Sequence, residues 1–292
     1  MTALRAHRRG GPEVLVVDRA PVPVPAAGEV LVAVRAAAIT FDELTWDETW
    51  ARMPVIPSHE VSGEIASGST EFQLGDDVYG LIDFDRDGGA AEFVAVPAAD
   101  LAAKPTTVSH AEAAALPLAG LTALQALVDH AAVRPGESVL VHGGAGGVGA
   151  LAVQLAGILG AHVTATIRSD AAELVHGFGA QRVIDVRTES FNDSGPYDVI
   201  VDTVGGETLQ RSSAALRPGG RLVTLSAPPP PGVTAIFFIV TPNRGQLTEL
   251  AALVDSGRLR VQIADTFPLA EGRQAFESRG CNRRAGKTVL VV

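Results

Sequence analysis

The chain has 292 residues, a formal net charge of −10, and 47% hydrophobic against 19% charged residues. This length suggests two domains, and the acidic balance argues against a nucleic-acid partner, because proteins that bind phosphate backbones present a basic face. The single cysteine, Cys281, excludes an internal disulfide and any metal site built from several cysteines.

The N-terminal residues are basic, but no apolar stretch follows them, so they do not have the pattern of a secretory signal. The window from Gly143 to Ala161 contains Gln154 as its one polar side chain. It opens with glycines, which is typical of a turn before a buried helix rather than of a membrane span. We therefore expect a soluble, cytoplasmic protein with no membrane partner.

The first third of the chain, up to about Pro105, predicts short strands separated by turns. The strands are expected at residues 14–17, 29–36, 61–66, 77–81 and 91–96. Short strands at this close spacing are typical of a compact β-barrel or sandwich.

The pattern changes near Ser109, which forms a capping box with Glu112 ahead of a helical stretch that Pro117 and Gly120 are expected to split. From Arg134 onward, short β-branched runs alternate with helical segments. Such runs without polar alternation indicate a parallel sheet buried on both faces, and so a doubly wound α/β domain. The last run, KTVLVV, lies far from this series and is expected to return to the N-terminal barrel.

A glycine-rich turn directly follows the predicted strand Ser138–His142 and precedes a helix. Gly144, Gly146 and Gly149 satisfy the pattern G-x-G-x-x-G. Glycines at this place let the backbone approach a pyrophosphate, whose charge meets the free N–H groups of the helix N-terminus. The pattern predicts dinucleotide binding, with a flexible turn that holds no ligand as the alternative.

The end of the next predicted strand bears on the choice of cofactor. An NAD site places a carboxylate there, whereas this strand ends in Arg168 and Ser169, which suit a 2′-phosphate. NADPH is therefore favoured over NADH. Asp170 could repel that phosphate or cap the following helix, and Arg168 could be an ordinary surface cation.

Segments across nearly the whole chain resemble the zinc-independent quinone oxidoreductase branch of the medium-chain dehydrogenase/reductase superfamily; they include GEVLVAVRAAAIT, IPSHEVSGEI, AALPLAGLTALQAL, ESVLVHGGAGGVG, LRPGGRLV and GKTVLVV. The resemblance implies a GroES-like β-barrel domain formed by residues 1–110 and completed by about 255–292. It implies a Rossmann NADP-binding domain at 111–254. It also implies a homodimer that pairs at the edge of the Rossmann sheet, for which Ala235–Val240 is the candidate strand unless that segment is internal.

Zinc-dependent relatives hold their metal through a cysteine, a His-Glu pair and a second cysteine. This chain has the pair His59-Glu60, but Thr40 stands where the first cysteine would be. A lone histidine without thiolate neighbours does not make a zinc site, so no metal is expected. We interpret His59-Glu60 as a hydrogen-bonded pair at the start of a strand.

The same resemblance implies contacts with the cofactor along the second domain. The pyrophosphate would lie on the glycine turn and the 2′-phosphate on Arg168 and Ser169, while Thr122 and Thr40 would lie near the nicotinamide. The remaining residues would cover the nucleotide; the implied set is Thr122, Gly144, Ala145, Gly146, Gly147, Val148, Gly149, Arg168, Ser169, Val204, Gly205, Ser226, Phe238, Ile239 and Val240. Val186 replaces a frequent tyrosine, and the stretches 41–57 and 227–233 look short, which leaves the substrate open.

The implied reaction is hydride transfer from NADPH to a quinone or an α,β-unsaturated carbonyl, whose developing negative charge needs a donor. The candidate donors are Thr40, Tyr79 and water, although Tyr79 also fits a barrel core. Trp46, Trp50 and Phe84 could form an apolar wall. The alternatives are a pathway-specific enoyl or ketone reductase, a non-redox cyclase of the same fold, and a non-catalytic NADPH-binding protein.

Overall fold

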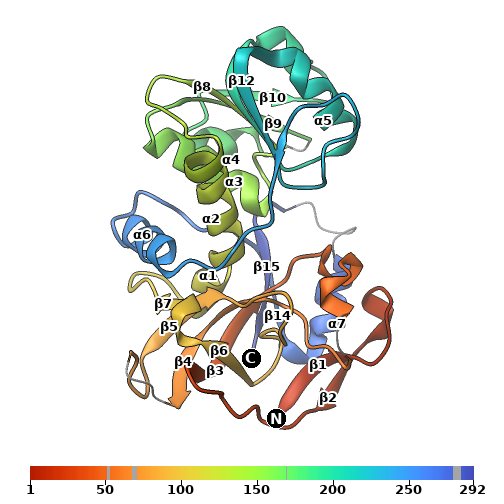
Figure 1. Ribbon diagram of the computed structural model, residues 1–292, viewed down its shortest axis with the longest axis vertical. Coiled ribbons are helices and arrows are strands. Elements are labelled where there is room, and N and C mark those ends of the chain that lie inside the picture. Colours follow the sequence, from red (N-terminus) through yellow and green to blue (C-terminus); the bar gives the residue numbers. More distant parts are fainter. Residues whose placement is uncertain (51–52, 68–70, 169, 279–283) are drawn as a thin grey trace. The chain divides into compact units, whose positions relative to one another are not determined.

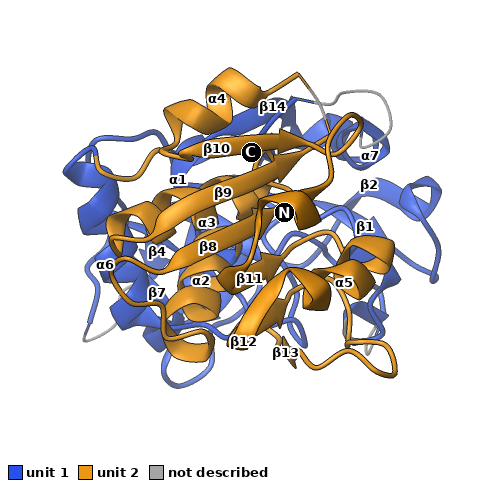
Figure 2. Ribbon diagram, turned by 90° about the horizontal axis from the view of Figure 1, so that it is seen from above, with its two compact units in different colours: residues 1–118, 241–257, 261–292 blue, residues 119–240, 258–260 orange. Residues whose placement is uncertain are grey.

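The computed structural model describes residues 1–50, 53–67, 71–168, 170–278 and 284–292 (Figure 1). The chain divides into two compact units (Figure 2). Unit 1 comprises Met1–Leu118, Thr241–Gly257 and Val261–Val292, and unit 2 comprises Ala119–Val240 and Arg258–Arg260. The sequence analysis placed residues up to 254 with the nucleotide-binding domain. Helix α6 (Arg244–Asp255) instead belongs to unit 1, where Arg244 Nε donates to the carbonyl of Leu101 at 2.8 Å.

Unit 1 is built on a curved sheet whose strands come from both ends of the chain. In the described residues its order is β14-β15-β3-β4-β5-β7, and β6 also pairs with β3. The strands are β3 (Glu29–Ala38), β4 (Glu60–Ser67), β5 (Asp77–Leu81), β6 (Phe93–Pro97), β7 (Leu101–Ala103), β14 (Ile263–Pro268) and β15 (Lys287–Val291). A separate antiparallel pair joins β1 (Thr2–Ala6) to β2 (Leu15–Arg19). Along β3, Val30, Val32 and Val34 are buried at alternate positions, so one face of this strand lies on the core.

The late strand β15 completes this sheet. It pairs antiparallel with β3, with Val289 opposite Ala38, and parallel with β14. The predicted return of KTVLVV to the N-terminal barrel is confirmed. Among the described residues, three α-helices belong wholly to this unit: α1 (His110–Ala114), α6 and α7 (Gly272–Glu277). The predicted capping box is present at the start of α1, with Ser109 and Glu112 bonded to each other's backbone N–H.

Unit 2 contains a parallel sheet, six-stranded in the described residues, in the order β10-β9-β8-β11-β12-β13 (Figure 2). The strands are β8 (Ser138–His142), β9 (His162–Ile167), β10 (Arg182–Asp185), β11 (Tyr197–Asp202), β12 (Leu216–Thr224) and β13 (Ile236–Phe237). This is the strand order of a Rossmann fold, so the expected doubly wound α/β fold is confirmed. Val139, Leu140 and Val141 of β8 are all inaccessible to solvent, as the uninterrupted apolar run predicts for a strand covered on both faces.

The helices of this unit are α3 (Gly147–Ile158), α4 (Ala172–Gly177) and α5 (Gly206–Ser212). Helix α2 (Pro117–Leu124) starts at the proline and continues into a π-helical turn, Gln125–His130. Gly120 lies inside α2, so the expectation that it splits the helix is wrong; the break falls at Ala115 and Leu116. No helix in the described ranges is long and apolar enough to cross a membrane.

Candidate active site

The glycine turn of unit 2 has the geometry that its sequence pattern predicts. Gly143 adopts a φ of +75°, and the chain enters α3 through Gly146, which has no side-chain cap. A Cβ on Gly149 would lie 2.1 Å from the carbonyl oxygen of Gly143, and one on Gly144 would lie 2.8 Å from the Cβ of Ala165. The turn therefore needs glycine at both places. It presents the N–H groups of the first turn of α3 without a capping side chain, which fits a pyrophosphate.

Most of the residues predicted to bind the cofactor follow the carboxyl ends of neighbouring strands. Asp202, the last residue of β11, pairs with His142 of β8 and with Thr224 of β12. Gly143, Val204 and Ser226 therefore lie along one edge of the sheet, and Arg168 extends this row after β9. This edge is where doubly wound sheets bind ligands. Ser169 lies outside the described residues.

Four other predicted positions lie elsewhere in the unit. Thr122 is buried in α2. Phe238, Ile239 and Val240 follow β13, and the Phe238 ring packs on His130 with 4.1 Å between ring centroids. The predicted strand over Ala235–Val240 is much shorter than expected, because among the described residues it pairs with β12 at Ile236 and Phe237 alone.

A buried carboxylate supports the loop after β11. Asp202 is inaccessible to solvent and accepts hydrogen bonds from the backbone N–H groups of Val204 and Gly205 at 3.0–3.2 Å. Burial raises the pKa of this carboxyl, and the two N–H bonds oppose that shift. Asp202 thus fixes the loop that carries Val204 and Gly205. The sequence analysis missed it, since an aspartate at a strand end has no distinctive spacing.

A second cation lies at the edge beside Arg168. Asp185, at the end of β10, is paired in register with Ile167 at the end of β9. Arg187, two residues further, bonds Asp170 at 2.7 Å and Asp185 at 2.6 Å. Asp170 is therefore held by a guanidinium. It does not cap α4, because the N-cap position is Ala171, which makes no side-chain cap hydrogen bond.

Unit 1 contains a cluster of charged groups around Thr40. Thr40 follows β3 and Lys287 opens β15, and the pairing of these strands brings the two residues together. The Lys287 ammonium donates to the Thr40 hydroxyl at 3.2 Å and forms an ion pair with Glu60. The side chains of Lys287 and Glu60 are only 11% and 1% exposed, so solvent screens this pair weakly.

Glu43 is a further buried member of the cluster. Its Oε2 accepts from the backbone N–H of Ser58 at 2.9 Å and contacts His59 Nδ1 at 3.1 Å. The other ring nitrogen of His59 lies 3.1 Å from the carbonyl oxygen of Arg86. The predicted hydrogen-bonded role of His59-Glu60 is confirmed, because Glu60 also accepts from the N–H of Leu118 at 3.0 Å. The sequence analysis did not identify Glu43.

Comparison with known proteins agrees with this architecture. The alcohol dehydrogenase GroES-like domain family matches residues 26–106, and the zinc-binding dehydrogenase family matches residues 178–290. An NADPH-dependent alkenal/one oxidoreductase of Arabidopsis thaliana is 33% identical over 302 residues, covering 96% of this chain and 77% of the plant protein. The chain belongs to the medium-chain dehydrogenase/reductase superfamily. The resemblance inferred from the sequence is confirmed, and so is the GroES-like nature of the N-terminal barrel.

Two further relatives cover almost all of this chain. The structure of the quinone oxidoreductase from Coxiella burnetii aligns with a TM-score of 0.91 at 29% identity, over 100% of this chain and 99% of that one. The spectinabilin polyketide synthase system protein NorB of Streptomyces orinoci is 36% identical over 318 residues, which are 99% of this chain but 14% of NorB. These matches place the chain in the quinone oxidoreductase and alkenal reductase-like branch of the superfamily.

Zinc, which some members of the superfamily bind, does not fit the described residues around Thr40. A hydroxyl replaces the thiolate, and both ring nitrogens of His59 already have hydrogen-bond partners. The Lys287 ammonium also lies between Thr40 and Glu60, where a second cation would be repelled. Cys281 lies outside the described residues.

Tyr79 does not have the environment of a proton donor. Its ring is fully buried on β5, and its hydroxyl donates to the carbonyl of Leu247 in α6 at 2.5 Å. Burial raises the pKa of this hydroxyl further. The alternative that the sequence left open, a core tyrosine, describes this side chain, and we do not include it in the proposed mechanism. The rings of Trp46 and Phe84 meet edge to face at 5.1 Å, and the Phe84 ring also lies 5.4 Å from the ring of His59.

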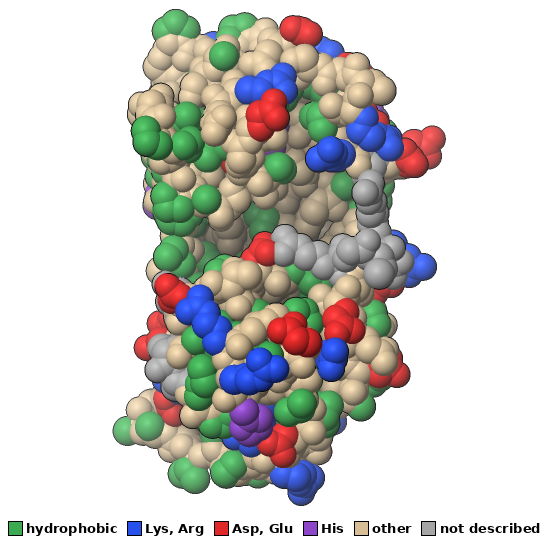
Figure 3. Space-filling view, turned by 90° about the vertical axis from the view of Figure 1, so that its right-hand side faces the viewer, with side chains coloured by type: hydrophobic (Ala, Val, Ile, Leu, Met, Phe, Trp, Pro, Cys, Tyr) green, Lys and Arg blue, Asp and Glu red, His purple; other side chains and the backbone are tan. Residues whose placement is uncertain are grey.

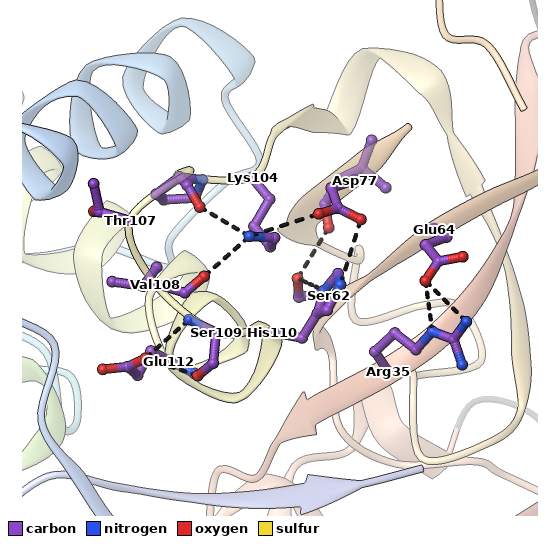
Figure 4. Close-up of polar contacts among 12 residues, drawn as sticks. Arg35, Ser62, Glu64, Asp77, Lys104, Thr107, Val108, Ser109, His110 and Glu112 are labelled. Atoms are coloured by element: carbon purple, nitrogen blue, oxygen red, sulfur yellow. Dashed lines mark hydrogen bonds and ion pairs between the residues drawn. The ribbon is translucent and has the colours of Figure 1, made fainter. Parts of the chain in front are cut away.

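Another titratable cluster of unit 1 lies on β4, β5 and α1 (Figure 4). Of the described residues, Glu64, Asp77 and His110 place their ligand atoms within 4.8 Å of one another. Arg35 bonds Glu64 at 2.8 Å and the Lys104 ammonium lies 3.7 Å from Asp77. These two cations already compensate both carboxylates, so we interpret the cluster as an ion-pair network that ties α1 to the sheet.

The outer surface carries charges of both signs. On the face shown in Figure 3, acidic and basic side chains are interspersed, and the described residues there form no continuous basic stripe.

Proposed function

We propose that this chain is an NADPH-dependent oxidoreductase that reduces quinones or α,β-unsaturated carbonyls without zinc. The observation that carries the proposal is the hydroxyl of Thr40, hydrogen-bonded to Lys287, at the place where zinc relatives have a cysteine. A hydroxyl and an ammonium can bind an oxygen that becomes negative, and such an oxygen arises when hydride adds to a quinone or an enone.

In this mechanism bound NADPH would supply the hydride. The glycine turn and the N-terminus of α3 would hold its pyrophosphate, and Arg168 and Arg187 would lie at the 2′-phosphate. Thr40 would bind the substrate oxygen. The paired rings of Trp46 and Phe84 would line an apolar wall for a planar substrate.

The test is to titrate NADPH and NADH separately and then to assay the preferred cofactor with 1,4-benzoquinone and but-3-en-2-one. We expect tighter binding of NADPH and loss of nicotinamide absorbance with at least one acceptor. Arg168→Ala should weaken NADPH much more than NADH, whereas Arg217→Ala, at the opposite end of the sheet beside Asp198, should change neither. An equal loss for both cofactors in Arg168→Ala would contradict the NADPH preference.

The similarity to the CurK enoyl reductase, whose structure aligns with a TM-score of 0.88 at 28% identity, supports a second candidate, a pathway-specific enoyl reductase. An enoyl thioester of pantetheine is the discriminating substrate: turnover of this thioester together with slow quinone reduction would favour the second candidate. Tight NADPH binding without turnover of any acceptor would favour a non-catalytic NADPH-binding protein.

We also propose a homodimer through the outer edge of β13. Ile236, Phe237 and Ile239 are 38%, 36% and 59% exposed there, and an apolar strand edge invites pairing with another strand. Sedimentation equilibrium of the wild type and of Ile236→Lys tests this, and a monomeric wild type would contradict it. The cytoplasmic location stays a prediction.

A further inference from the structure

The two lysines of the chain have side chains that are only 8% and 11% exposed in unit 1, but they have different hydrogen-bond partners. Lys104 donates to the carbonyl oxygens of Pro105 and Val108, each at 3.0 Å, and faces Asp77 (Figure 4). Carbonyl oxygens accept hydrogen bonds but cannot pass a proton on. Lys104 is therefore a structural cation that holds a loop to the barrel.

Lys287 instead donates to a hydroxyl. Within the described residues, Thr40 Oγ1 has the Lys287 ammonium as its one hydrogen-bond partner, at 3.2 Å. Because the ammonium has no lone pair, Thr40 must accept in this bond, and its own hydrogen points away from Lys287. Thr40 is half-buried, so a ligand can reach that hydrogen.

Burying the charge of Lys287 costs free energy, so stability alone does not explain why a lysine stands here. Glu60 compensates the charge, but a buried ion pair rarely stabilises a protein more than apolar side chains of the same size would. We propose that Lys287 supplies, through Thr40, the proton and the positive charge that the substrate oxygen needs. This inference rests on the proposed function and deepens it by naming the proton source of the same site.

With an enone as substrate, Thr40 and Lys287 transfer protons in sequence. Hydride adds to the β-carbon, the carbon–carbon double bond shifts, and the carbonyl oxygen becomes an enolate oxygen. Thr40 gives its proton to that oxygen, and Lys287 gives one of its protons to Thr40 Oγ1. Bound NADPH would supply the hydride and would be the group that is oxidised. The resulting enol tautomerises to the ketone, and Lys287 regains a proton from water. Glu60 keeps the amine oriented toward Thr40 throughout.

Because Lys287 acts through Thr40, it is a positioning residue, and its test needs readouts that a purely structural role would not change. Lys287→Met should lower kcat for but-3-en-2-one by about 100-fold, while the Kd of NADPH and the KM of the enone change by less than about twofold. Thr40→Val should have the same effect, and the double variant should be no slower than either single variant. Lys104→Met is the matched control and should keep the wild-type kcat.

Two variants separate charge from proton supply. Lys287→Arg keeps the ion pair with Glu60, but a guanidinium cannot release its proton, so kcat should stay low. Lys287→Ala should be rescued by ethylamine, with kcat rising with amine concentration, whereas Thr40→Val should not respond. If Lys287→Met does not fold, the cause would be the unpaired charge that it leaves on Glu60. The double variant Lys287→Met, Glu60→Gln removes both charges, and its kcat is then measured instead.

The outcomes distinguish the two proposals. A wild type that oxidises NADPH, with a Lys287→Met variant of equal kcat, would overturn the role of Lys287 alone. A raised Kd for NADPH with unchanged kcat would also overturn it, since the lysine would then bind the cofactor. A wild type that turns over neither acceptor would overturn the proposed function and this inference with it.

Discussion

The Arg187 guanidinium holds the Asp170 carboxylate at 2.7 Å, across the ends of the neighbouring strands β9 and β10. The aspartate is 93% exposed, so the pair itself adds little stability. Its importance lies in the local charge. Asp170 lies next to the predicted 2′-phosphate site after β9, and in the sequence its negative charge argued against NADPH. The positive charge of Arg187 offsets it.

This pairing predicts opposite effects from its two members. Asp170→Ala removes a negative charge and should tighten NADPH by about fivefold at low salt, corresponding to roughly 1 kcal/mol, and leave NADH nearly unchanged. Arg187→Ala should weaken NADPH by a similar factor. Fluorescence titration at low and high salt measures both effects. Asp198→Ala, which breaks the pair with Arg217 at the amino ends of the strands, should affect neither cofactor.

Two glycines of α3 provide a matched pair of substitutions. Gly149→Ala would force its Cβ against the carbonyl of Gly143, and we expect NADPH binding to weaken by more than about tenfold. Gly157 has open space around its Cβ, so Gly157→Ala should raise the free energy of unfolding by about 0.5–1 kcal/mol and leave binding unchanged. Unchanged NADPH affinity in Gly149→Ala would contradict the assignment of this turn to the pyrophosphate.

Ser58, which precedes His59, adopts a φ of +71° and buries an Oγ with no hydrogen-bond partner among the described residues. Ser58→Gly should relieve both penalties and raise the free energy of unfolding by about 1 kcal/mol, measured by urea denaturation. Ala132 has a φ of +46° but is exposed, so Ala132→Gly should gain less. A less stable Ser58→Gly protein would show that the conformation is not strained.

His142 predicts how stability depends on pH. It is buried between the hydroxyls of Thr166 and Ser212, each 3.1 Å away, and burial lowers its pKa to about 3. The unfolded chain has the higher pKa, near 6.5, so it binds the proton first and stability falls as pH drops from about 6.5 toward 3.

The free energy of unfolding should therefore fall by up to about 2 kcal/mol between pH 7 and pH 5 through His142 alone. His142→Gln should be less stable at pH 7 and should lose that part of the pH dependence. Urea titrations at the two pH values measure the difference. An equal fall in both proteins would show that His142 does not carry the effect.

The features that could be predicted from the sequence depend on residues that lie close together along the chain. The glycine turn, the capping box of Ser109 and Glu112, and the hydrogen-bonded His59-Glu60 pair each have a local pattern, and the structure contains all three. Strand β1 was missed because TALRA has no β-branched run at its centre.

The contacts around Thr40 and Asp170 could not be predicted in the same way. Lys287 reaches Thr40 because β15 pairs with β3, and no local spacing encodes a contact between residues so far apart. Arg187 meets Asp170 because β9 and β10 lie in register. For Tyr79 the sequence left two alternatives open, a proton donor and a core residue. Its hydroxyl is bonded to the carbonyl of Leu247 inside the same unit, a long-range contact that no local spacing encodes.

The place of β15 between β14 and β3 has a consequence for synthesis on the ribosome. The parallel sheet of unit 2 is encoded by consecutive strands, so it can form while translation continues. The barrel cannot close, and the Lys287–Thr40 contact cannot exist, until residues 287–291 have emerged. We expect protease digestion of stalled ribosome complexes to reveal a protected unit 2 beside an accessible N-terminal third. The chemistry of this site is thus assembled last.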